Sequence, residues 1–370
     1  MRQVSYFFAG GGTGGHIYPA VAVAEQIVKL QPAAKIHFLV STRSIDSQIL
    51  SKTNFKYTQL PAKGFAIRPG KLIGFCTSFL KSSRVAGKII AAGKNAVVIG
   101  VGGFVAAPVC WAGHKRKVPI VLLNVDIVPG RANKIIGRWA DEIFVQFEDT
   151  VQCFAHSGAQ IDVVGCPLRS GFANPQPDRL IEQLGLEKQK KILLITGASS
   201  GAESINRAVC LLLEKLNAFA DDWQIVHLTG QAGFEKVNKK YADVKIGHKV
   251  LGYYNDMPSL LSAADLVVGR SGAVSVAEYA ASCLPSICMP YPYHKDRHQY
   301  LNAGKLVSAG AAIIVDDLPD DKERAEWLAE ELEVLMKNDE KRKKMAENCK
   351  GLANKDASLK IAEKLLKITC

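Results

Sequence analysis

Short runs rich in valine, isoleucine and phenylalanine alternate with helix-favouring stretches along most of this 370-residue chain, and the alternation occurs twice. In the first half such runs occupy residues 4–8, 36–40, 97–101, 120–124 and 142–146. In the second half they occupy residues 191–195, 224–228, 265–268, 286–289 and 312–315. Strands that alternate with helices form parallel sheets covered by helices. The sequence therefore predicts two α/β domains of the same architecture.

The boundary between the two domains is expected where the chain resists regular structure. Residues 169–178 read Arg-Ser-Gly-Phe-Ala-Asn-Pro-Gln-Pro-Asp, and a residue before proline is disfavoured in a helix. The chain also exceeds the length at which a single hydrophobic core stops growing. We predict an N-terminal domain of residues 1–168 and a C-terminal domain of residues 169–352.

The composition excludes several classes of protein. Hydrophobic residues make up 48% and charged residues 22% of the chain, which indicates a globular protein rather than a disordered one. The N-terminal residues lack the pattern of a signal peptide, so we expect a cytoplasmic protein. The uncharged stretch 96–113 is interrupted by glycines and by Pro108, which predicts a strand and a loop rather than a membrane span. The nine cysteines form no C-x-x-C pair, and we expect them to be reduced and to bind no zinc.

The net charge of +12 favours an anionic partner. A nucleic acid, a phosphorylated substrate and an acidic membrane surface all satisfy this condition, and so does a surface that is merely basic. Charge alone does not choose among them.

A glycine-rich loop follows the first predicted strand. Residues 10–16 read Gly-Gly-Gly-Thr-Gly-Gly-His and precede a predicted helix with Pro19 in its first turn. Glycines let backbone N–H groups approach a ligand, and a helix N-terminus favours negative charge. The spacing matches neither a P-loop nor a dinucleotide fingerprint, so we predict a phosphate or diphosphate site of another type. The alternatives are a purely structural turn for the loop and a loop-ordering role for His16, which is otherwise a candidate general base.

Two further glycine loops follow predicted strands. Gly102-Gly103-Phe104 opens on the same sheet edge as the first loop, because ligands of such sheets bind at the carboxyl ends of the strands. Residues 197–202, Gly-Ala-Ser-Ser-Gly-Ala, repeat the arrangement in the second domain. Two such loops predict two phosphate-bearing ligands.

Two polar segments follow later strands. In residues 270–278, Ser271 is expected to cap a helix whose free N–H groups bind a phosphate, and Glu278 is placed to accept hydrogen bonds from ribose hydroxyls. A solvated surface glutamate is the alternative for Glu278. Residues 290–299 are rich in tyrosine, histidine and charge, as suits a sugar site.

The motifs GGTGGH, GGF near residue 103, GCPLR at 165–169, SGAVSVAE at 271–278 and HKDRHQ at 294–299 together resemble the bacterial MurG family over nearly the whole chain. The resemblance implies the GT-B fold, with two Rossmann-like domains facing each other across a cleft and a C-terminal helix, at about 353–370, that returns to the first domain. It implies an inverting transfer of N-acetylglucosamine (GlcNAc) from UDP-GlcNAc to the muramoyl 4-hydroxyl of lipid I. The product is lipid II, for peptidoglycan synthesis. We expect no metal or cofactor, because the sequence lacks an obvious Asp-x-Asp pair near the donor loops and amide dipoles with an arginine can stabilise the leaving diphosphate.

The resemblance also implies roles for individual residues. Glu278 would hold the ribose, Arg169 and Ser199 the donor diphosphate, and the main chain of Tyr254 the uracil. The implied donor-binding residues are Thr13, Gly14, Gly15, Asp126, Arg169, Ser199, Tyr254, Ala273, Val274, Ser275, Glu278, His298 and Gln299. The implied contacts to the acceptor diphosphate are Gly11, Gly12, Gly14, Gly15, His16, Gly102 and Gly103.

Three segments depart from the family pattern. His298 stands where the family has the first of two glutamines, which recognises the sugar. Residues 123–126 read Leu-Asn-Val-Asp where the family has His-Glu-Gln-Asn, so Asp126 replaces an asparagine. A carboxylate accepts a hydrogen bond from a sugar hydroxyl as an amide oxygen does, and it can also act as a base. His16 and Asp126 are therefore both candidates for the catalytic base. Ala198 and Ser200 replace a glycine and a glutamine.

Residues 63–94 interleave apolar side chains with Lys71, Lys81, Arg84 and Lys88. This pattern suits docking on the anionic inner face of the cell membrane, and an ordinary amphipathic helix packed on its sheet is the alternative.

Other functions kept open are a GT-B transferase with another acceptor or sugar nucleotide, a sugar-nucleotide epimerase and a non-catalytic sugar-nucleotide binder. Nucleic-acid binding is the other non-enzymatic alternative, and it predicts salt-sensitive affinity for DNA or RNA without a response to UDP-GlcNAc. We expect no nucleic-acid partner.

Overall fold

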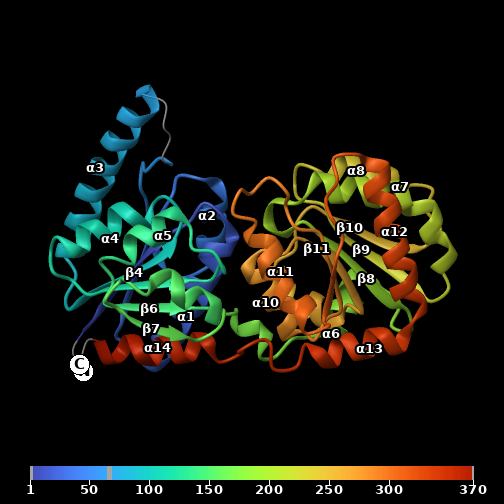
Figure 1. The fold of residues 1–370 in the computed structure, drawn as a ribbon. Helices are drawn as coiled ribbons and strands as arrows, with labels where there is room; N and C mark the ends of the chain where they lie inside the picture. The colour runs from blue at the N-terminus through green and yellow to red at the C-terminus, as the bar shows by residue number, and fades with distance from the viewer. Residues whose placement is uncertain (1–2, 65–68, 369–370) are drawn as a thin grey trace. The chain divides into compact units, whose positions relative to one another are not determined.

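The chain forms two compact units, each built around its own sheet. Unit 1 comprises residues 1–169 and 354–370, and unit 2 comprises residues 170–353. The computed structural model describes residues 3–64 and 69–368 (Figure 1). In both units parallel strands alternate with helices. The prediction of an α/β fold with two Rossmann-like parallel sheets is confirmed.

Unit 1 contains a seven-stranded sheet in the order β3-β2-β1-β4-β5-β6-β7. Its strands are β1 (Ser5–Gly10), β2 (Lys35–Val40), β3 (Lys56–Gln59), β4 (Ala96–Gly102), β5 (Ile120–Asn124), β6 (Glu142–Val145) and β7 (Gln160–Val163). The central strand β1 is buried along its whole length. Parallel sheets are covered on both faces, which explains why such strands read as continuous apolar runs.

The helices of unit 1 are α1 (Gly14–Leu30), α2 (Ser44–Leu50), α3 (Pro69–Ala91), α4 (Ala106–His114), α5 (Arg131–Ile136) and α14 (Ala357–Ile368), with a 3₁₀ helix at Glu148–Phe154. The C-terminal helix α14 packs against α1. Lys364 of α14 forms an ion pair with Asp162 at 2.7 Å. Just before α14, the Asn354 amide donates to the Val164 carbonyl at 3.0 Å. These contacts fix the C-terminal segment on unit 1.

Unit 2 contains a six-stranded parallel sheet in the order β10-β9-β8-β11-β12-β13. Its strands are β8 (Lys191–Thr196), β9 (Trp223–Leu228), β10 (Gly247–Leu251), β11 (Leu266–Gly269), β12 (Ser286–Cys288) and β13 (Ala312–Ile314). Its helices are α6 (Pro177–Leu184), α7 (Glu203–Leu216), α8 (Phe234–Lys240), α9 (Met257–Ala263), α10 (Ala273–Ala281), α11 (His298–Ser308), α12 (Asp321–Lys337) and α13 (Asp339–Asn348). Short 3₁₀ helices lie at Ser170–Phe172, Ala198–Ser200 and Asn217–Phe219.

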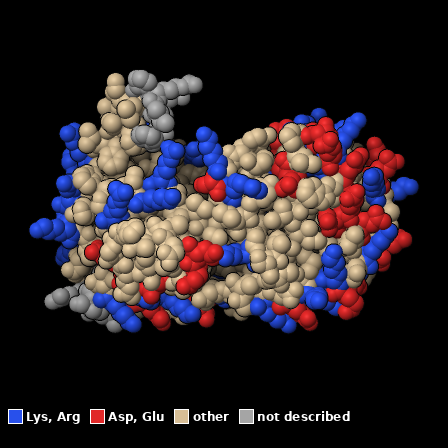
Figure 2. Space-filling model, viewed as in Figure 1, with Lys and Arg blue, Asp and Glu red and all other residues tan. Residues whose placement is uncertain are grey.

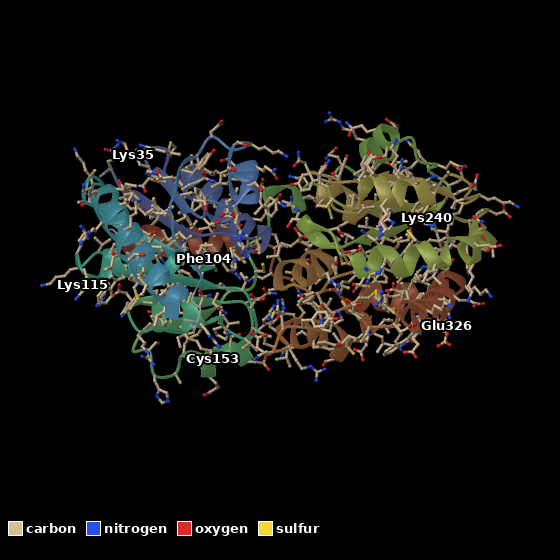
Figure 3. The ribbon with its side chains drawn as sticks, turned by 90° about the horizontal axis from the view of Figure 1, so that it is seen from above. Lys35, Phe104, Lys115, Cys153, Lys240 and Glu326 are labelled. Atoms are coloured by element: carbon tan, nitrogen blue, oxygen red, sulfur yellow. The ribbon has the colours of Figure 1, made fainter. Side chains whose placement is uncertain are left out.

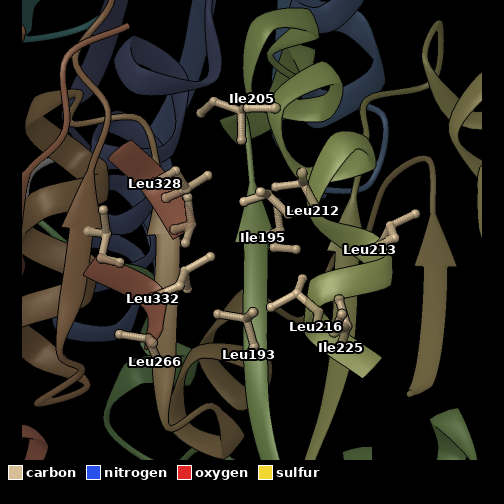
Figure 4. Close-up of a cluster of buried hydrophobic side chains, with 14 of the residues drawn as sticks. Leu193, Ile195, Ile205, Leu212, Leu213, Leu216, Ile225, Leu266, Leu328 and Leu332 are labelled. Carbon is tan, nitrogen blue, oxygen red and sulfur yellow. The ribbon is translucent and has the colours of Figure 1, made fainter. Parts of the chain in front are cut away.

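The core of unit 2 lies between its sheet and the helices α7 and α12 (Figure 4). Leu212 of α7 and Leu328 of α12 are nearly inaccessible to solvent, as are Leu193 and Ile195 of β8. Burying one such side chain contributes about 1.5–3 kcal/mol. The two helices thus hold the central strand β8 in place, and with it the loop that follows β8.

Among residues 3–64 and 69–368, no helix is both long enough and apolar enough to span a bilayer. The same residues contain no cluster of three or more His, Cys, Asp or Glu side chains able to hold a metal ion.

Candidate active site

The strand order of each sheet marks where a ligand should bind. In unit 1 the order reverses between β1 and β4, and in unit 2 it reverses between β8 and β11. Ligands of open α/β sheets bind beyond the carboxyl ends of the strands at such a reversal. The loops at these points are 11–13 and 103–105 in unit 1, and 197–202 and 270–272 in unit 2. The glycine loops singled out in the sequence therefore lie at the two reversal points.

The two glycine loops of unit 1 touch each other. A Cβ atom at Gly103 would lie 2.4 Å from the Gly11 carbonyl oxygen, and Gly103 has a φ of +79°. Gly11 and Gly12 also have positive φ, at +137° and +92°. Only glycine fits such close backbone approach in this conformation. Loops 10–16 and 102–104 thus form one continuous backbone surface.

His16 lies on this surface near the start of α1. Its Nδ1 atom is 3.2 Å from the Thr13 hydroxyl oxygen. A Cβ atom at Gly102 would lie 2.7 Å from the His16 ring, so the imidazole packs against the second loop. The ring is half-buried. This placement is compatible with both roles predicted for His16, a base and a loop-ordering contact.

Asp126 lies in the loop after β5, the strand beside β4. Its carbonyl oxygen accepts a hydrogen bond from the Asn124 amide at 2.7 Å. The Asn124 side-chain oxygen in turn accepts from the amide of the buried Asn133 at 2.8 Å. The sequence reading assigned no role to Asn124 or Asn133. Together they fix the main chain that carries Asp126, whose side chain is half-buried.

A buried carboxylate supports the first glycine loop from behind. Asp46 of α2 has no exposed surface, and both of its side-chain oxygens accept from the Gly12 N–H, at 2.7 and 2.9 Å. Gly12 therefore has no free N–H to offer a phosphate. The N–H groups at the start of α1, at Gly14 and Gly15, lack intrahelical partners, as at the start of any helix. The sequence analysis missed Asp46, because its link to Gly12 is a contact 34 residues apart in the chain.

Arg169 is the last residue of the first segment of unit 1. Its guanidinium lies 4.4 Å from the ring centre of Tyr18, which lies two residues after His16 in α1. A cation held on an aromatic ring keeps its charge and hydrogen-bond donors for other partners. Arg169 thus lies beside the helix that carries the first glycine loop.

In unit 2, loop 197–202 is shaped by its contact with the end of β9. A Cβ atom at Gly201 would lie 2.3 Å from the Thr229 carbonyl oxygen, and Gly201 has a φ of +74°. Ala198 also has a positive φ, +60°, which is strained for a residue with a Cβ atom. Ser199, a predicted donor contact, lies between them and is half-buried.

The second loop of unit 2 leads into α10. Gly272, not Ser271, is the N-cap residue, and no side chain caps this helix. The prediction that Ser271 caps α10 is therefore wrong: Ser271 is fully buried, and its hydroxyl has no hydrogen-bond partner among the described residues. The first turn, Ala273, Val274 and Ser275, begins at this uncapped end. Glu278 lies further along α10 and is only 9% exposed, so it is not a solvated surface glutamate.

Arg270 fixes this loop from the inside. Its guanidinium donates to the Met289 carbonyl at the end of β12, at 2.8 Å. It also forms an ion pair with Asp317 at 2.8 Å and donates to the Ser204 hydroxyl at 2.9 Å. Arg324 of α12 lies 3.4 Å from the other oxygen of Asp317. All three charged groups are buried, so loop 270–272 is tied to β12, α7 and α12 by a buried ionic network.

The polar segment 290–299 forms its own cluster at the start of α11. The rings of His294 and His298 stack with their centres 4.3 Å apart. His298 Nδ1 lies 2.7 Å from the carboxylate of Asp296. The Gln299 side-chain oxygen accepts a hydrogen bond from the Tyr291 N–H at 2.9 Å.

Tyr254, the predicted uracil contact, follows β10, and burial and the nearby Asp256 raise the pKa of its hydroxyl.

The predicted site residues divide between the two units. Those of unit 1 are Gly11, Gly12, Thr13, Gly14, Gly15, His16, Gly102, Gly103, Asp126 and Arg169. Those of unit 2 are Ser199, Tyr254, Ala273, Val274, Ser275, Glu278, His298 and Gln299. The structure brings together the glycines of unit 1 with His16, and it places Ser199 and the first turn of α10 at the reversal point of unit 2. Their roles toward ligands stay predictions.

A buried histidine supports loop 197–202. His227 of β9 is fully buried, with its two ring nitrogens 3.0 Å from the Tyr241 hydroxyl and 3.0 Å from the Asn206 side-chain oxygen. Asn206 also donates to the Thr229 carbonyl at 2.9 Å. Burial lowers the pKa of His227 to about 3, so this histidine is neutral in the folded protein at neutral pH.

This histidine makes the stability of unit 2 depend on pH. Unfolded histidine titrates near 6.5, so below that pH the unfolded chain binds a proton that the folded chain does not. Stability is retained above pH 6.5 and falls by up to about 1.4 kcal/mol per pH unit as the pH drops toward 3. We expect His227→Gln to remove about 2 kcal/mol of the stability difference between pH 7 and pH 5. Urea unfolding followed by circular dichroism tests this, and an unchanged difference would contradict it.

Comparison with known proteins places both units among glycosyltransferases. Residues 6–145 match the glycosyltransferase family 28 N-terminal domain, and residues 192–362 match the glycosyltransferase family 28 C-terminal domain. A UDP-N-acetylglucosamine--N-acetylmuramyl-(pentapeptide) pyrophosphoryl-undecaprenol N-acetylglucosamine transferase of Desulforamulus reducens is 34% identical, with 99% of each chain covered. A protein of the same name from Listeria welshimeri is 32% identical over 97% of this chain and 98% of its own.

Solved structures agree with these relatives. The crystal structure of Acinetobacter baumannii MurG matches with a TM-score of 0.74 and 25% identity, over 99% of this chain and 100% of that chain. A UDP-GlcNAc 2-epimerase from Neisseria meningitidis, bound to UDP-GlcNAc, matches with a TM-score of 0.69 but only 15% identity, over 99% and 100% of the two chains. The second likeness shows a shared fold alone.

Proposed function

We infer that this chain, which belongs to the MurG family of glycosyltransferases, transfers GlcNAc from UDP-GlcNAc to the muramoyl 4-hydroxyl of lipid I and so forms lipid II. The observation that carries the proposal is the match to transferases of this name over nearly the full length of both chains. The structure adds support, because each unit has its own anion-binding geometry at a strand-order reversal. Two such sites suit a reaction between two diphosphate-bearing substrates.

Unit 2 binds the donor in this proposal. The N-terminus of α10 directs its positive end toward the UDP diphosphate, and Ser199 adds a hydroxyl from the neighbouring loop. Glu278 accepts the ribose hydroxyls, and its low exposure makes such hydrogen bonds stronger than in water. Tyr254 contacts the uracil through its main chain, while His298 and Gln299 meet the sugar.

Unit 1 binds the acceptor. The joined surface of loops 10–16 and 102–104 accepts the diphosphate of the lipid-linked acceptor, and α1 directs its positive end toward it. The 4-hydroxyl oxygen attacks the anomeric carbon as the bond to the UDP oxygen breaks, which inverts the anomeric centre. His16 or Asp126 takes the hydroxyl proton. The scheme requires no metal, since helix N-termini and Arg169 stabilise the departing diphosphate.

One observation favours a second function, transfer of a different sugar. His298 occupies the sugar-recognition position and is paired with Asp296, so the pair presents a different hydrogen-bonding pattern from a glutamine. We therefore propose to compare acceptor-dependent UDP release from UDP-GlcNAc, UDP-N-acetylgalactosamine and UDP-glucose. The primary proposal requires the highest kcat/KM with UDP-GlcNAc. A higher value with another sugar nucleotide would support the second function instead.

The acceptor carries a lipid, and unit 1 has a surface suited to an anionic membrane. Unit 1 contains 24 Lys and Arg against 10 Asp and Glu, whereas unit 2 contains 23 against 25. The positive charge of the chain therefore belongs to unit 1. In Figure 2, Lys and Arg side chains gather along the side of unit 1 that carries α3 and α4, while those of unit 2 alternate with acidic ones.

Helix α3 divides into two parts. Its C-terminal part packs into the unit 1 core through Ala86 and Ile90. Its N-terminal part leaves three apolar side chains exposed, Leu72 at 39%, Ile73 at 68% and Leu80 at 54%. Lys81 and Arg84 are exposed beside them. The side chain of Lys71 lies outside the described residues. The C-terminal part of α3 thus fits a helix packed on its sheet, and the exposed apolar side chains of the N-terminal part support the proposal of membrane docking.

An aromatic cluster that the sequence analysis missed joins the neighbouring helix α4, which packs against α3, to Trp139 in the segment after α5. The rings of Trp111 and Trp139 are 5.1 Å apart, and His114 lies 6.0 Å from each. Lys115, which points outward in Figure 3, lies 4.4 Å from the Trp111 ring. Tryptophan and lysine together are typical of a membrane interface. We propose that unit 1 docks on the cytoplasmic face of the membrane as a peripheral protein.

Neutralising two cations of α3 tests the docking. A cation near an anionic bilayer contributes about 1 kcal/mol, so Lys81→Gln with Arg84→Gln should weaken binding by about 30-fold. Co-sedimentation with vesicles that contain phosphatidylglycerol measures the change. The matched control, Lys236→Gln with Lys240→Gln on α8 of unit 2, should bind as the unchanged protein does. Equal binding by both double variants would refute docking through α3.

A further inference from the structure

The start of α2, together with the connection from β2, determines the conformation of the first glycine loop. Besides the Gly12 N–H, the buried Asp46 carboxylate accepts from the Ser41 N–H at 3.1 Å and from the Ser41 hydroxyl at 2.5 Å. A Cβ atom at Gly11 would lie 2.3 Å from an Asp46 oxygen, so the carboxylate also explains why residue 11 is glycine. Asp46 therefore holds Gly11 and Gly12 in their positive-φ conformation.

This support places a negative charge directly behind the proposed diphosphate site. The half-buried Asp126, from the loop after β5, adds a second carboxylate at the same sheet edge. Like charges disfavour a bound anion. A diphosphate on the loop thus requires a compensating cation close to it.

Arg43 lies where such a cation is needed. Its Nη1 atom donates to the Gly12 carbonyl at 2.9 Å, and its guanidinium carbon lies 5.6 Å from the ring centre of Phe104 in the second glycine loop. Arg43 thus contacts both loops at once. It is exposed, and no carboxylate of the described residues forms an ion pair with it. A guanidinium has five N–H donors, so four remain for a ligand.

We propose that Arg43 binds the acceptor diphosphate and that Asp46 positions the loop beneath it. Arginine suits this ligand because its planar fork donates two parallel hydrogen bonds to phosphate oxygens. Arg43 lies three residues before Asp46, at the start of α2. One short segment thus supplies the carboxylate that supports the loop and the cation that offsets the negative charge of that carboxylate. The proposal rests on the proposed function, because that function assigns the acceptor diphosphate to unit 1.

Calorimetry with inorganic diphosphate tests the subsite without any transfer reaction. Saturating UDP occupies the donor site of unit 2, and divalent cations are left out. We expect Arg43→Ala to weaken diphosphate binding by about 10- to 30-fold, and Arg43→Lys to have an intermediate effect because it keeps the charge but not the fork. Lys35→Ala, at the opposite end of β2, removes one charge from the same unit and should change affinity less than twofold. If Arg43→Ala binds diphosphate as tightly as the unchanged protein does, the proposal is overturned. It is also overturned if the unchanged protein does not bind diphosphate.

Transfer kinetics distinguish the acceptor from free diphosphate. With a short-chain lipid I analogue, Arg43→Ala should raise the acceptor KM by about 10- to 30-fold while the KM for UDP-GlcNAc stays unchanged. Added salt should narrow this difference, which a merely structural role would not produce. Asp46→Asn should impair acceptor use in the same selective way. An unchanged acceptor KM in Arg43→Ala would overturn the acceptor assignment, whereas failure of transfer in the unchanged protein would count against the proposed function and leave the calorimetry decisive for Arg43.

Discussion

Replacing Asp317 with alanine is expected to lower the free energy of unfolding of unit 2 by about 3–5 kcal/mol. Asp317 is 8% exposed and pairs with Arg270 at 2.8 Å and with Arg324 at 3.4 Å. It also accepts the Ser204 hydroxyl at 2.7 Å. Its loss leaves two buried guanidinium groups without this partner. The size of the effect follows from burial, since the same change in an exposed pair costs only about 0–1 kcal/mol.

Urea unfolding followed by circular dichroism measures this effect. Asp243→Ala is the matched control, because Asp243 is exposed in the same unit and its removal should change stability by less than about 0.5 kcal/mol. Because Arg270 is the first residue of loop 270–272, Asp317→Ala should also weaken UDP binding. A cost below about 1 kcal/mol for Asp317→Ala would show that the network does not stabilise unit 2 as described.

Replacing Glu278 with alanine is expected to weaken UDP-GlcNAc binding by about 100-fold without loss of the fold. A carboxylate that accepts ribose hydroxyls makes charge-assisted hydrogen bonds, each worth about 1.5–3 kcal/mol. Glu278 is nearly buried on α10, two turns from the loop that is proposed to bind the diphosphate. Calorimetry measures the affinity, and circular dichroism checks the fold. Glu326→Ala, on the exposed face of α12, is the control and should bind UDP-GlcNAc normally.

A double-mutant cycle with a modified nucleotide makes this test specific to the ribose. The unchanged protein should bind UDP about tenfold more tightly than 2′-deoxy-UDP, since the deoxy sugar lacks one proposed hydrogen bond. In Glu278→Ala the two nucleotides should bind equally, because the partner of the missing hydroxyl is gone. If the variant still prefers UDP by the same factor, Glu278 does not contact the ribose.

The fold was predictable to the extent that its strands are buried. All ten predicted strands correspond to strands of the structure, and the sequence analysis missed β3, β7 and β10. Each of these three is an edge strand, half exposed to solvent, such as β3 with the polar sequence Lys-Tyr-Thr-Gln. An edge strand need not bury both faces, so it lacks the continuous apolar run that marks a central strand.

The glycine loops of the site were predictable for a related reason. Glycine at Gly11 or Gly103 is required by the backbone itself, and such a requirement is visible in a single segment of sequence. Asp46 and Arg43 could not be found in this way, because they act on Gly12 through contacts more than 30 residues away in the chain. The ion pair between Arg270 and Asp317 is a similar case, because β12 and β13 separate the two residues in the chain. Ser271 shows the opposite error. Serine is favoured at helix caps, but Ser271 is buried and lies one position before the N-cap residue Gly272.

The central claim is transfer of GlcNAc to a lipid-linked muramoyl acceptor. The most direct measurement is UDP release from UDP-GlcNAc at pH 7 to 8, with and without a short-chain lipid I analogue, together with the mass of the acceptor product. The account predicts that UDP release depends on the acceptor and that the product gains the mass of one N-acetylhexosamine. Tight binding of UDP-GlcNAc with neither UDP release nor a heavier acceptor would contradict it.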